Sequence, residues 1–292
     1  MWHDGEFVEE VNIPLDAHGL HYGGAVYEGM RFYQTHGGCR AVFRLDDHLE
    51  RLLYSAGVME MVCPFSVAEL KAVILELIRR SGLSEGYVRP IVFNGSGLGL
   101  CAKNLTTHAG VVVLPWEQAT RPISLIKSSL MRLHPASAIM EAKIAGHYVN
   151  SRLAALEAKR AGADDALLLD YEGNVAETSV ANVFLINGGR ISTPACGNIF
   201  PGLTRASVIA LCTEQKIEVQ ERSVSLGAAL FSDAMFVAGT ACEVLAISRL
   251  GDKTYDPANP VLLRCRELYQ QAIRGQIASR TQWLTVVEEA TS

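Results

Sequence analysis

Short apolar runs of strand length alternate irregularly with amphipathic helical patterns, and this alternation limits the fold more than any other feature. The runs are far shorter than the roughly 20 apolar residues of a membrane-spanning helix. Hairpin-type turns at 171–174 and 187–189 add to an irregular order that predicts an α+β architecture rather than a regular βαβ array. The expected strands are Val42–Leu45, Tyr87–Asn94, Gly110–Leu114, Ile123–Lys127, Ala166–Asp170, Asn182–Ile186 and Met235–Ala238.

Apolar residues at helical spacing predict the helices between these strands. The pattern is clearest in Ser66–Ser81, where Ser66 and Glu69 have the spacing of a capping box. The expected helices are Asp46–Gly57, Ser66–Ser81, His147–Ala161, Thr204–Gln215 and Val261–Ile277.

The polar, proline-bounded segment Trp116–Pro122 interrupts two strand-like runs and indicates a domain boundary. A chain of 292 residues is long enough for two domains. We expect a small N-terminal domain at 1–117, a linker at 118–127 and a large domain at 128–292.

Composition excludes several classes of protein. A net charge of −5 gives no basic surface for nucleic acid, and 49% hydrophobic residues exclude a disordered chain. The seven cysteines form no C-x-x-C pair, and the first residues have no signal-peptide pattern, so we expect a cytoplasmic protein with reduced thiols.

His18 and His21 have no third ligand nearby, so we expect no metal site. The glycine-rich stretch 94–100 has no P-loop pattern and is interpreted as a loop, mobile or closing over a site.

Only seven lysines stand beside nineteen arginines, which shortens the search for a catalytic amine. Lys143 differs from the other six because Ala142, Ile144, Ala145 and Gly146 surround it with small, apolar groups. Such surroundings favour a desolvated amine with a lowered pKa, the form that acts as a nucleophile in Schiff-base chemistry. A surface lysine remains the ordinary alternative.

Other residues have the chemistry of a pyridoxal phosphate site. Glu177 lies in a polar insertion between two apolar runs, and Thr204 stands at the start of a helix whose amides would hold a phosphate. Gly239–Ala241 follows a strand, and Arg44 stands between a strand and a helix. Taken singly, each has an ordinary role as a turn acid, a helix cap or a surface ion-pair partner.

Together these residues resemble the branched-chain amino acid aminotransferases, within the fold type IV pyridoxal-phosphate enzymes. The motifs that carry the resemblance run along nearly the whole chain. They are His21-Tyr-Gly23, Tyr27-Glu-Gly-Met-Arg31, Phe43-Arg-Leu45 with His48, Tyr87-Val-Arg-Pro90, Glu141-Ala-Lys143 with Tyr148, Glu177 with Ala181-Asn182, Pro201-Gly-Leu-Thr-Arg205 and Gly239-Thr240.

The resemblance implies a two-domain fold with a small α/β domain, a larger domain with a barrel-like β core, and pyridoxal 5'-phosphate between them. It implies that Lys143 is the Schiff-base lysine and the proton shuttle. The remaining cofactor contacts that it implies are Arg44, Leu203, Thr204 and Thr240 at the phosphate, Tyr148 at the ring hydroxyl oxygen and Glu177 at the pyridine nitrogen.

The resemblance also implies the substrate pocket. Aromatic walls would take aliphatic side chains, Arg89 would bind the distal carboxylate of glutamate, and Arg31 would support the site. The implied substrate contacts are Tyr22, Tyr27, Arg31, Tyr87, Arg89, Leu100, Trp116, Thr240 and Ala241. Tyr27 stands where many members have phenylalanine, and Ala119 where bacterial members have tyrosine, so the pocket lining departs from theirs.

The implied reaction is transamination of L-leucine, L-isoleucine and L-valine with 2-oxoglutarate by a homodimer or higher homo-oligomer, in which Tyr22 and the loop carrying Leu100 reach across the interface. The alternatives are a D-amino acid or (R)-amine transaminase and, further off, an aminodeoxychorismate lyase. A cofactor-binding protein without turnover is the alternative outside enzymology.

Overall fold

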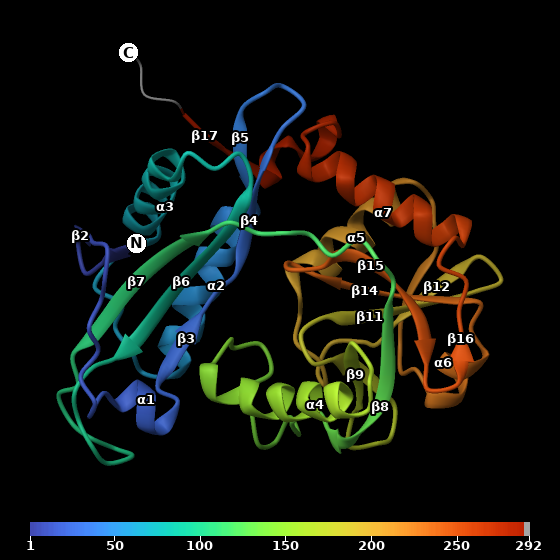
Figure 1. Ribbon diagram of the computed structural model, residues 1–292, viewed down its shortest axis with the longest axis horizontal. Helices are drawn as coiled ribbons and strands as arrows, with labels where there is room; N and C mark the ends of the chain where they lie inside the picture. Colours follow the sequence, from blue (N-terminus) through green and yellow to red (C-terminus); the bar gives the residue numbers. More distant parts are fainter. Residues whose placement is uncertain (289–292) are drawn as a thin grey trace. The chain divides into compact units, whose positions relative to one another are not determined.

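The computed structural model describes residues 1–288, which divide into two compact units (Figure 1). The first comprises Met1–Glu117, Ala142–Gly146 and the described residues from Ala272 onward, and the second comprises Gln118–Glu141 and His147–Gln271. The expected division placed the last two segments of the first unit in the second domain. They belong to the first because each pairs with its strands.

An antiparallel sheet of eight strands forms the framework of the first unit. Its order is β17-β5-β4-β6-β7-β1-β2, and β3 pairs with β6. The strands are β1 (Trp2–His3), β2 (Glu6–Phe7), β3 (Ala25–Tyr27), β4 (Met30–Gln34), β5 (Arg40–Phe43), β6 (Gly86–Asn94), β7 (Thr107–Leu114) and β17 (Leu284–Val287).

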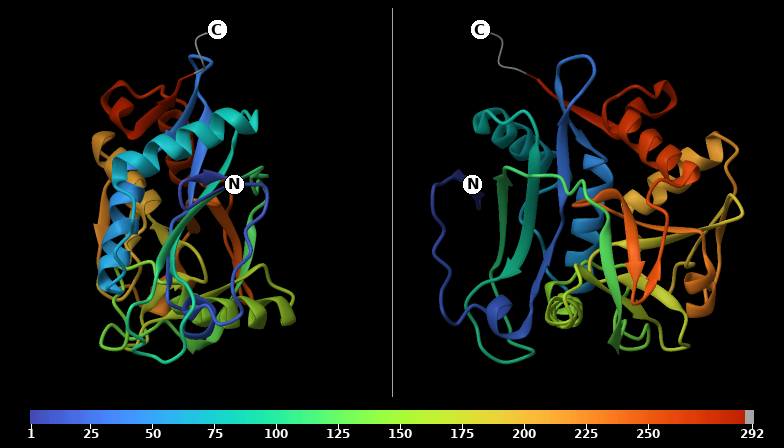
Figure 2. Two further views of the ribbon diagram at one scale, coloured as in Figure 1. Left: turned by 90° about the vertical axis from the view of Figure 1, so that its left-hand side faces the viewer. Right: turned by 45° about the vertical axis from the view of Figure 1, so that its right-hand side comes forward.

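Two amphipathic helices, α2 (Leu45–Val58) and α3 (Val67–Ser81), lie together on one face of this sheet (Figure 2). Their buried residues, such as Leu52 and Ile74, share one core with Val26 and Val88 of the strands. The capping box predicted at the start of α3 is confirmed, because the side chains of Ser66 and Glu69 each bond the other's backbone N–H. A short helix, α1 (His18–Tyr22), precedes β3.

A closed ring of six strands forms the centre of the second unit, in the order β10-β9-β8-β15-β14-β11, with β11 pairing back to β10. The other strands extend this sheet. The strands are β8 (Ile123–Met131), β9 (Asp165–Leu169), β10 (Val175–Thr178), β11 (Asn182–Asn187), β12 (Arg190–Thr193), β13 (Val219–Glu221), β14 (Ala234–Gly239), β15 (Glu243–Leu250) and β16 (Lys253–Thr254).

Helices pack on the outside of this barrel. Ala154 and Ala158 of α4 share a core with Ala166 and Leu168 of β9. The helices are α4 (Tyr148–Arg160), α5 (Leu203–Glu214), α6 (Leu226–Phe231) and α7 (Pro260–Ile273), with 3-10 turns η1 (Ala145–His147) and η2 (Ala278–Trp283).

The predicted α+β class and barrel-like core are confirmed, and every predicted strand and helix is present within a few residues of its expected bounds. Glu177 is the exception in local structure. The polar insertion expected around it is the buried strand β10, since its polar side chains find partners inside the unit. Within residues 1–288 no helix combines the length and apolarity that a bilayer crossing requires.

Candidate active site

The backbone of Lys143 is fixed inside the first unit from both sides. Its N–H donates to the Ser55 hydroxyl on α2 at 2.9 Å, and its carbonyl accepts from the Tyr27 N–H on β3 at 3.2 Å. Ala142 and Ile144 on either side are buried in the core of this unit. The small, apolar surroundings that set this lysine apart in the sequence therefore anchor it between a helix and a strand.

The Lys143 side chain lies near Tyr27, Arg89 and Tyr87. These four residues are here called the lysine cluster. Nζ lies 5.3 Å from the centroid of the Tyr27 ring, and the Arg89 guanidinium lies 4.5 Å from the same centroid. Arg89 donates to the Tyr87 hydroxyl at 2.6 Å, and Trp116 stacks on the Tyr87 ring at 4.9 Å. The structure thus brings together four of the predicted substrate residues and the predicted catalytic lysine.

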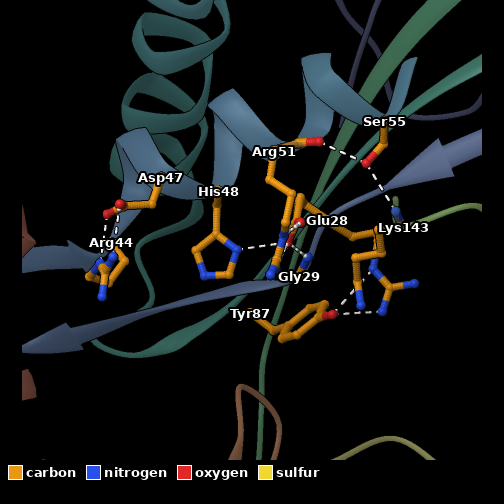
Figure 3. Close-up of polar contacts among 10 residues, drawn as sticks. Glu28, Gly29, Arg44, Asp47, His48, Arg51, Ser55, Tyr87 and Lys143 are labelled. Carbon is orange, nitrogen blue, oxygen red and sulfur yellow. Dashed lines mark hydrogen bonds and ion pairs between the residues drawn. The ribbon is translucent and has the colours of Figure 1, made fainter. Parts of the chain in front are cut away.

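A buried carboxylate, Glu28, organises the adjoining face of α2 (Figure 3). Its oxygens accept from Arg51 at 2.5 Å and from His48 Nδ1 at 2.7 Å. Burial raises the pKa of Glu28, but the charges of Arg51 and His48 outweigh it and hold this pKa well below its usual range. Burial also lowers the pKa of His48. The ionised carboxylate thereby holds the Arg51 guanidinium in a fixed orientation, with the Arg51 side chain 13% exposed.

Arg44, the predicted phosphate ligand, lies at the opposite end of α2 from Ser55 (Figure 3). Its guanidinium donates two hydrogen bonds to Asp47, at 2.6 and 2.8 Å, and lies 5.0 Å from the centroid of the Trp283 ring. Arg44 and Ser55 are separated by about 16 Å of helix axis, whereas Arg51 is one turn from Ser55. Arg51 is therefore the arginine of α2 on the side where Lys143 is held.

The remaining predicted residues of the first unit occupy separate positions. Arg31 is 2% exposed, with its guanidinium 4.0 Å from Glu85 and 4.7 Å from the Tyr33 ring centroid. The Tyr22 hydroxyl accepts the Gly99 N–H at 3.0 Å, and Leu100 in the same loop is 75% exposed. Tyr22 and this loop are thus joined within one chain.

In the second unit, Glu177 is the centre of a buried polar group, here called the glutamate cluster: Glu177, Arg132 and Asn182. One carboxylate oxygen accepts from Arg132 Nε, and the other accepts from Asn182 Nδ2 at 3.1 Å and from the Phe200 N–H at 3.2 Å. All three side chains are at most 9% exposed. This set of donors fixes the carboxylate in place.

Asn182 also joins Glu177 to the start of α5. Its amide donates to the Phe200 carbonyl at 2.9 Å, and its oxygen lies so close to Gly202 that a Cβ there would be 2.2 Å away. Gly202 caps α5, so the N–H groups of Leu203 and Thr204 are among the first of the helix, which have no carbonyl partner within it. Such groups bind anions.

The last predicted residues flank this region of the second unit. Glu177 on β10 is opposite Asn182 on β11, which is in turn opposite Ala238 on β14. The loop with Thr240 and Ala241 directly follows β14. Tyr148 begins α4 and is half-buried.

Arg51 and Arg132 are functional candidates that the sequence alone does not reveal. No local pattern marks Arg51, because its partner Glu28 lies 23 residues away and the Ser55–Lys143 contact nearby spans 88 residues. Arg132 follows β8 and meets a partner 45 residues away, so no local pattern marks it.

Comparison with known proteins matches this architecture to one family. A profile of the family "Amino-transferase class IV" matches residues 25–250. The chain belongs to this family. It is an enzyme, and its relatives place it among the branched-chain aminotransferases.

Three relatives illustrate the likeness. A branched-chain-amino-acid aminotransferase of Pseudomonas aeruginosa is 34% identical over 99% of this chain and 97% of its own. The crystal structure of a branched-chain aminotransferase from Thermoproteus uzoniensis with norvaline has a TM-score of 0.94 at 31% identity, covering 98% of both chains. A branched-chain amino acid aminotransferase from Thermobaculum terrenum in its PLP form has a TM-score of 0.90 at 28% identity, covering 96% of this chain and 94% of its own.

Proposed function

We propose that this aminotransferase uses pyridoxal 5'-phosphate to transfer the amino group of L-leucine, L-isoleucine and L-valine to 2-oxoglutarate. The observation that carries the proposal is the lysine cluster, in which a lysine with a fixed backbone shares the ring of Tyr27 with Arg89. The cluster places an amine beside an aromatic ring and a guanidinium. The ring would contact an aliphatic side chain, and the guanidinium would bind an acidic one.

The residues present fit the cofactor. Its phosphate requires hydrogen-bond donors, which the first amides of α5 and the Thr204 and Thr240 hydroxyls would supply. Its ring nitrogen requires a carboxylate, which Glu177 would supply. Either Arg44 or Arg51 would add a guanidinium at the phosphate. We favour Arg51, because Asp47 binds Arg44 while the Glu28 pairing orients Arg51 on the side of α2 that holds Lys143.

When bound, the cofactor supplies a ring that accepts electrons from the carbon atom losing its proton. Lys143 Nζ would remove and return the proton at the substrate Cα, as general base and then general acid. Glu177 would keep a proton on the ring nitrogen, Tyr148 would contact the ring hydroxyl oxygen, and Tyr87 with Ala241 would bind the substrate α-carboxylate. The aromatic faces of Tyr22, Tyr27 and Trp116 would bury an aliphatic side chain and exclude water.

We also propose a homodimer or higher homo-oligomer that resides in the cytoplasm. The exposed leucines of the loop with Gly99, Leu98 at 62% and Leu100 at 75%, offer an apolar contact for a second copy. All seven cysteines are free thiols, as a reducing compartment favours.

A panel of half-reactions tests the proposed function. Purified enzyme is mixed with L-leucine, L-glutamate, D-alanine or (R)-1-phenylethylamine, and the visible absorbance of the cofactor is followed. We expect the two L-amino acids to discharge the band, whereas a response confined to D-alanine or the (R)-amine would replace the proposal with the corresponding transaminase. Lys143→Ala should lack the band of the lysine-bound cofactor, and Lys127→Ala, the matched control, should retain it.

A further inference from the structure

A cluster outside the proposed active site has the composition of a metal site. His3, Asp4 and His108 each offer one ligand atom, and these atoms lie within 4.8 Å of one another. His3 ends β1 and His108 lies on β7, in the first unit. Since His3 is opposite Gly110, His108 is its diagonal neighbour on the same face of the sheet.

Asp4 is held so that its carboxylate lies between the two imidazoles. Its backbone N–H donates to the Ala109 carbonyl at 3.0 Å, and its Oδ1 accepts from the Ala109 N–H at 2.8 Å. Its other oxygen, Oδ2, lies 2.6 Å from His108 Nδ1 and 3.6 Å from His3 Nε2. Partial burial raises the pKa of Asp4, but the hydrogen bonds from His108 and Ala109 and the charges of the two histidines lower it overall. The carboxylate is thus ionised at neutral pH and fixed by the strand beside it.

The His3 imidazole has an unpaired nitrogen at this cluster, and its side chain is 25% exposed. Its Nε2 is buried and has no hydrogen-bond partner among residues 1–288. The 3.6 Å separation from Asp4 Oδ2 is too long for a hydrogen bond. It is close to the separation of about 3.4 Å between two ligand atoms on one tetrahedral zinc ion, given metal–ligand distances near 2.0–2.1 Å.

Neighbouring groups hold both rings in place. Phe93 packs beside His108 and His3, with centroid distances of 5.2 and 6.1 Å. The far nitrogen of His108, Nε2, lies against Gly95, where a Cβ would be 2.5 Å away. His108 Nδ1 therefore faces Asp4, and an ion between them would require the present 2.6 Å contact to open by less than about 1 Å to reach tetrahedral spacing.

We propose that His3, Asp4 and His108 form a binding site for a borderline divalent transition-metal ion, Zn²⁺ first among them. Two neutral imidazoles and one carboxylate are a ligand set that Zn²⁺ prefers, and water would complete the tetrahedron. The site is independent of the transamination proposed above.

The test uses tag-free enzyme loaded with its cofactor. Zn²⁺ binding is measured by competition with a chromophoric chelator, and Co²⁺ serves as a spectroscopic substitute whose visible bands report tetrahedral coordination. We expect one Zn²⁺ per chain and at least about tenfold weaker binding in His3→Gln, in His108→Gln and in Asp4→Asn. Asparagine tolerates the φ of 46° at position 4, so Asp4→Asn keeps the turn if a histidine variant fails to fold.

His36→Gln, which alters a histidine of the same unit outside the cluster, should bind Zn²⁺ as the wild type does. Unchanged affinity in all three cluster variants would place the ion elsewhere and overturn the proposal. The same conclusion follows if the wild type binds less than one Zn²⁺ per chain or shows no tetrahedral Co²⁺ bands.

Discussion

The hydroxyl of Tyr87 lies directly against the Cα of Gly29, so close that a Cβ on Gly29 would be 1.9 Å from the hydroxyl oxygen. Gly29 is the central residue of the motif Tyr27-Glu-Gly-Met-Arg31, and its N–H donates to Glu28 at 3.2 Å. The absence of a side chain at position 29 therefore allows Tyr87 to reach Arg89. One glycine joins the buried Glu28 network to the lysine cluster.

Gly29→Ala should displace the Tyr87 ring, because the added methyl group overlaps its hydroxyl and its Cζ atom. We expect a loss of about 1–3 kcal/mol in the free energy of unfolding and a weakened Tyr87–Arg89 contact. Urea unfolding and the L-glutamate half-reaction measure the two effects. Gly57→Ala on α2, where a Cβ meets nothing within 4 Å, is the control and should change stability by at most about 1 kcal/mol. Wild-type behaviour of Gly29→Ala would show that the ring moves freely.

Exchanging arginine for lysine on α2 distinguishes the two candidate phosphate ligands. Lysine keeps the positive charge beside Glu28 or Asp47 but loses the planar, bidentate geometry that suits a phosphate. Arg51→Lys should weaken cofactor binding at least about tenfold, whereas Arg44→Lys should leave it nearly unchanged. The dissociation constant is obtained by titrating cofactor-free enzyme with pyridoxal phosphate. A larger loss in Arg44→Lys than in Arg51→Lys would return the phosphate role to Arg44.

Acidification should destabilise the first unit through Glu28 and His48. Both pKa values are lowered by folding, from the ordinary 4.5 for Glu28 and 6.5 for His48. The stability that each contributes is therefore complete above its ordinary pKa and is lost as the pH falls toward its lowered one. Each proton contributes a slope of at most about 1.4 kcal/mol per pH unit.

Urea unfolding between pH 7.5 and 4 measures this dependence. In His48→Gln, which retains a donor for Glu28, the decline that begins below pH 6.5 should be shallower than in the wild type. An identical pH dependence of the two proteins would exclude His48 as a source of the acid sensitivity.

Arg89→Ala should separate the two classes of amino acid substrate. The Arg89 guanidinium is oriented by Tyr87 and Tyr27, and we assign it to the distal carboxylate of glutamate, which leucine lacks. Loss of a charge-assisted hydrogen bond predicts about a 10- to 100-fold lower kcat/KM for the L-glutamate half-reaction and a much smaller effect for L-leucine. Arg152→Ala, at an exposed position on α4, is the control. Equal losses for both amino acids would contradict the assignment.

The sequence by itself determined the local elements and singled out Lys143 among the seven lysines. Helix α3 was predictable with its capping box because Ser66 and Glu69 are three residues apart, and Lys143 stood out because its immediate neighbours are small and apolar. Such features depend on residues within one or two helical turns.

Only the tertiary structure decided which polar groups meet. Arg51 finds Glu28 across 23 residues, and Arg132 finds Glu177 across 45. Strand register and the packing of α2 on its sheet set these contacts. A buried charge takes the partner that the folded backbone brings within hydrogen-bond distance, and local periodicity carries no record of that distance.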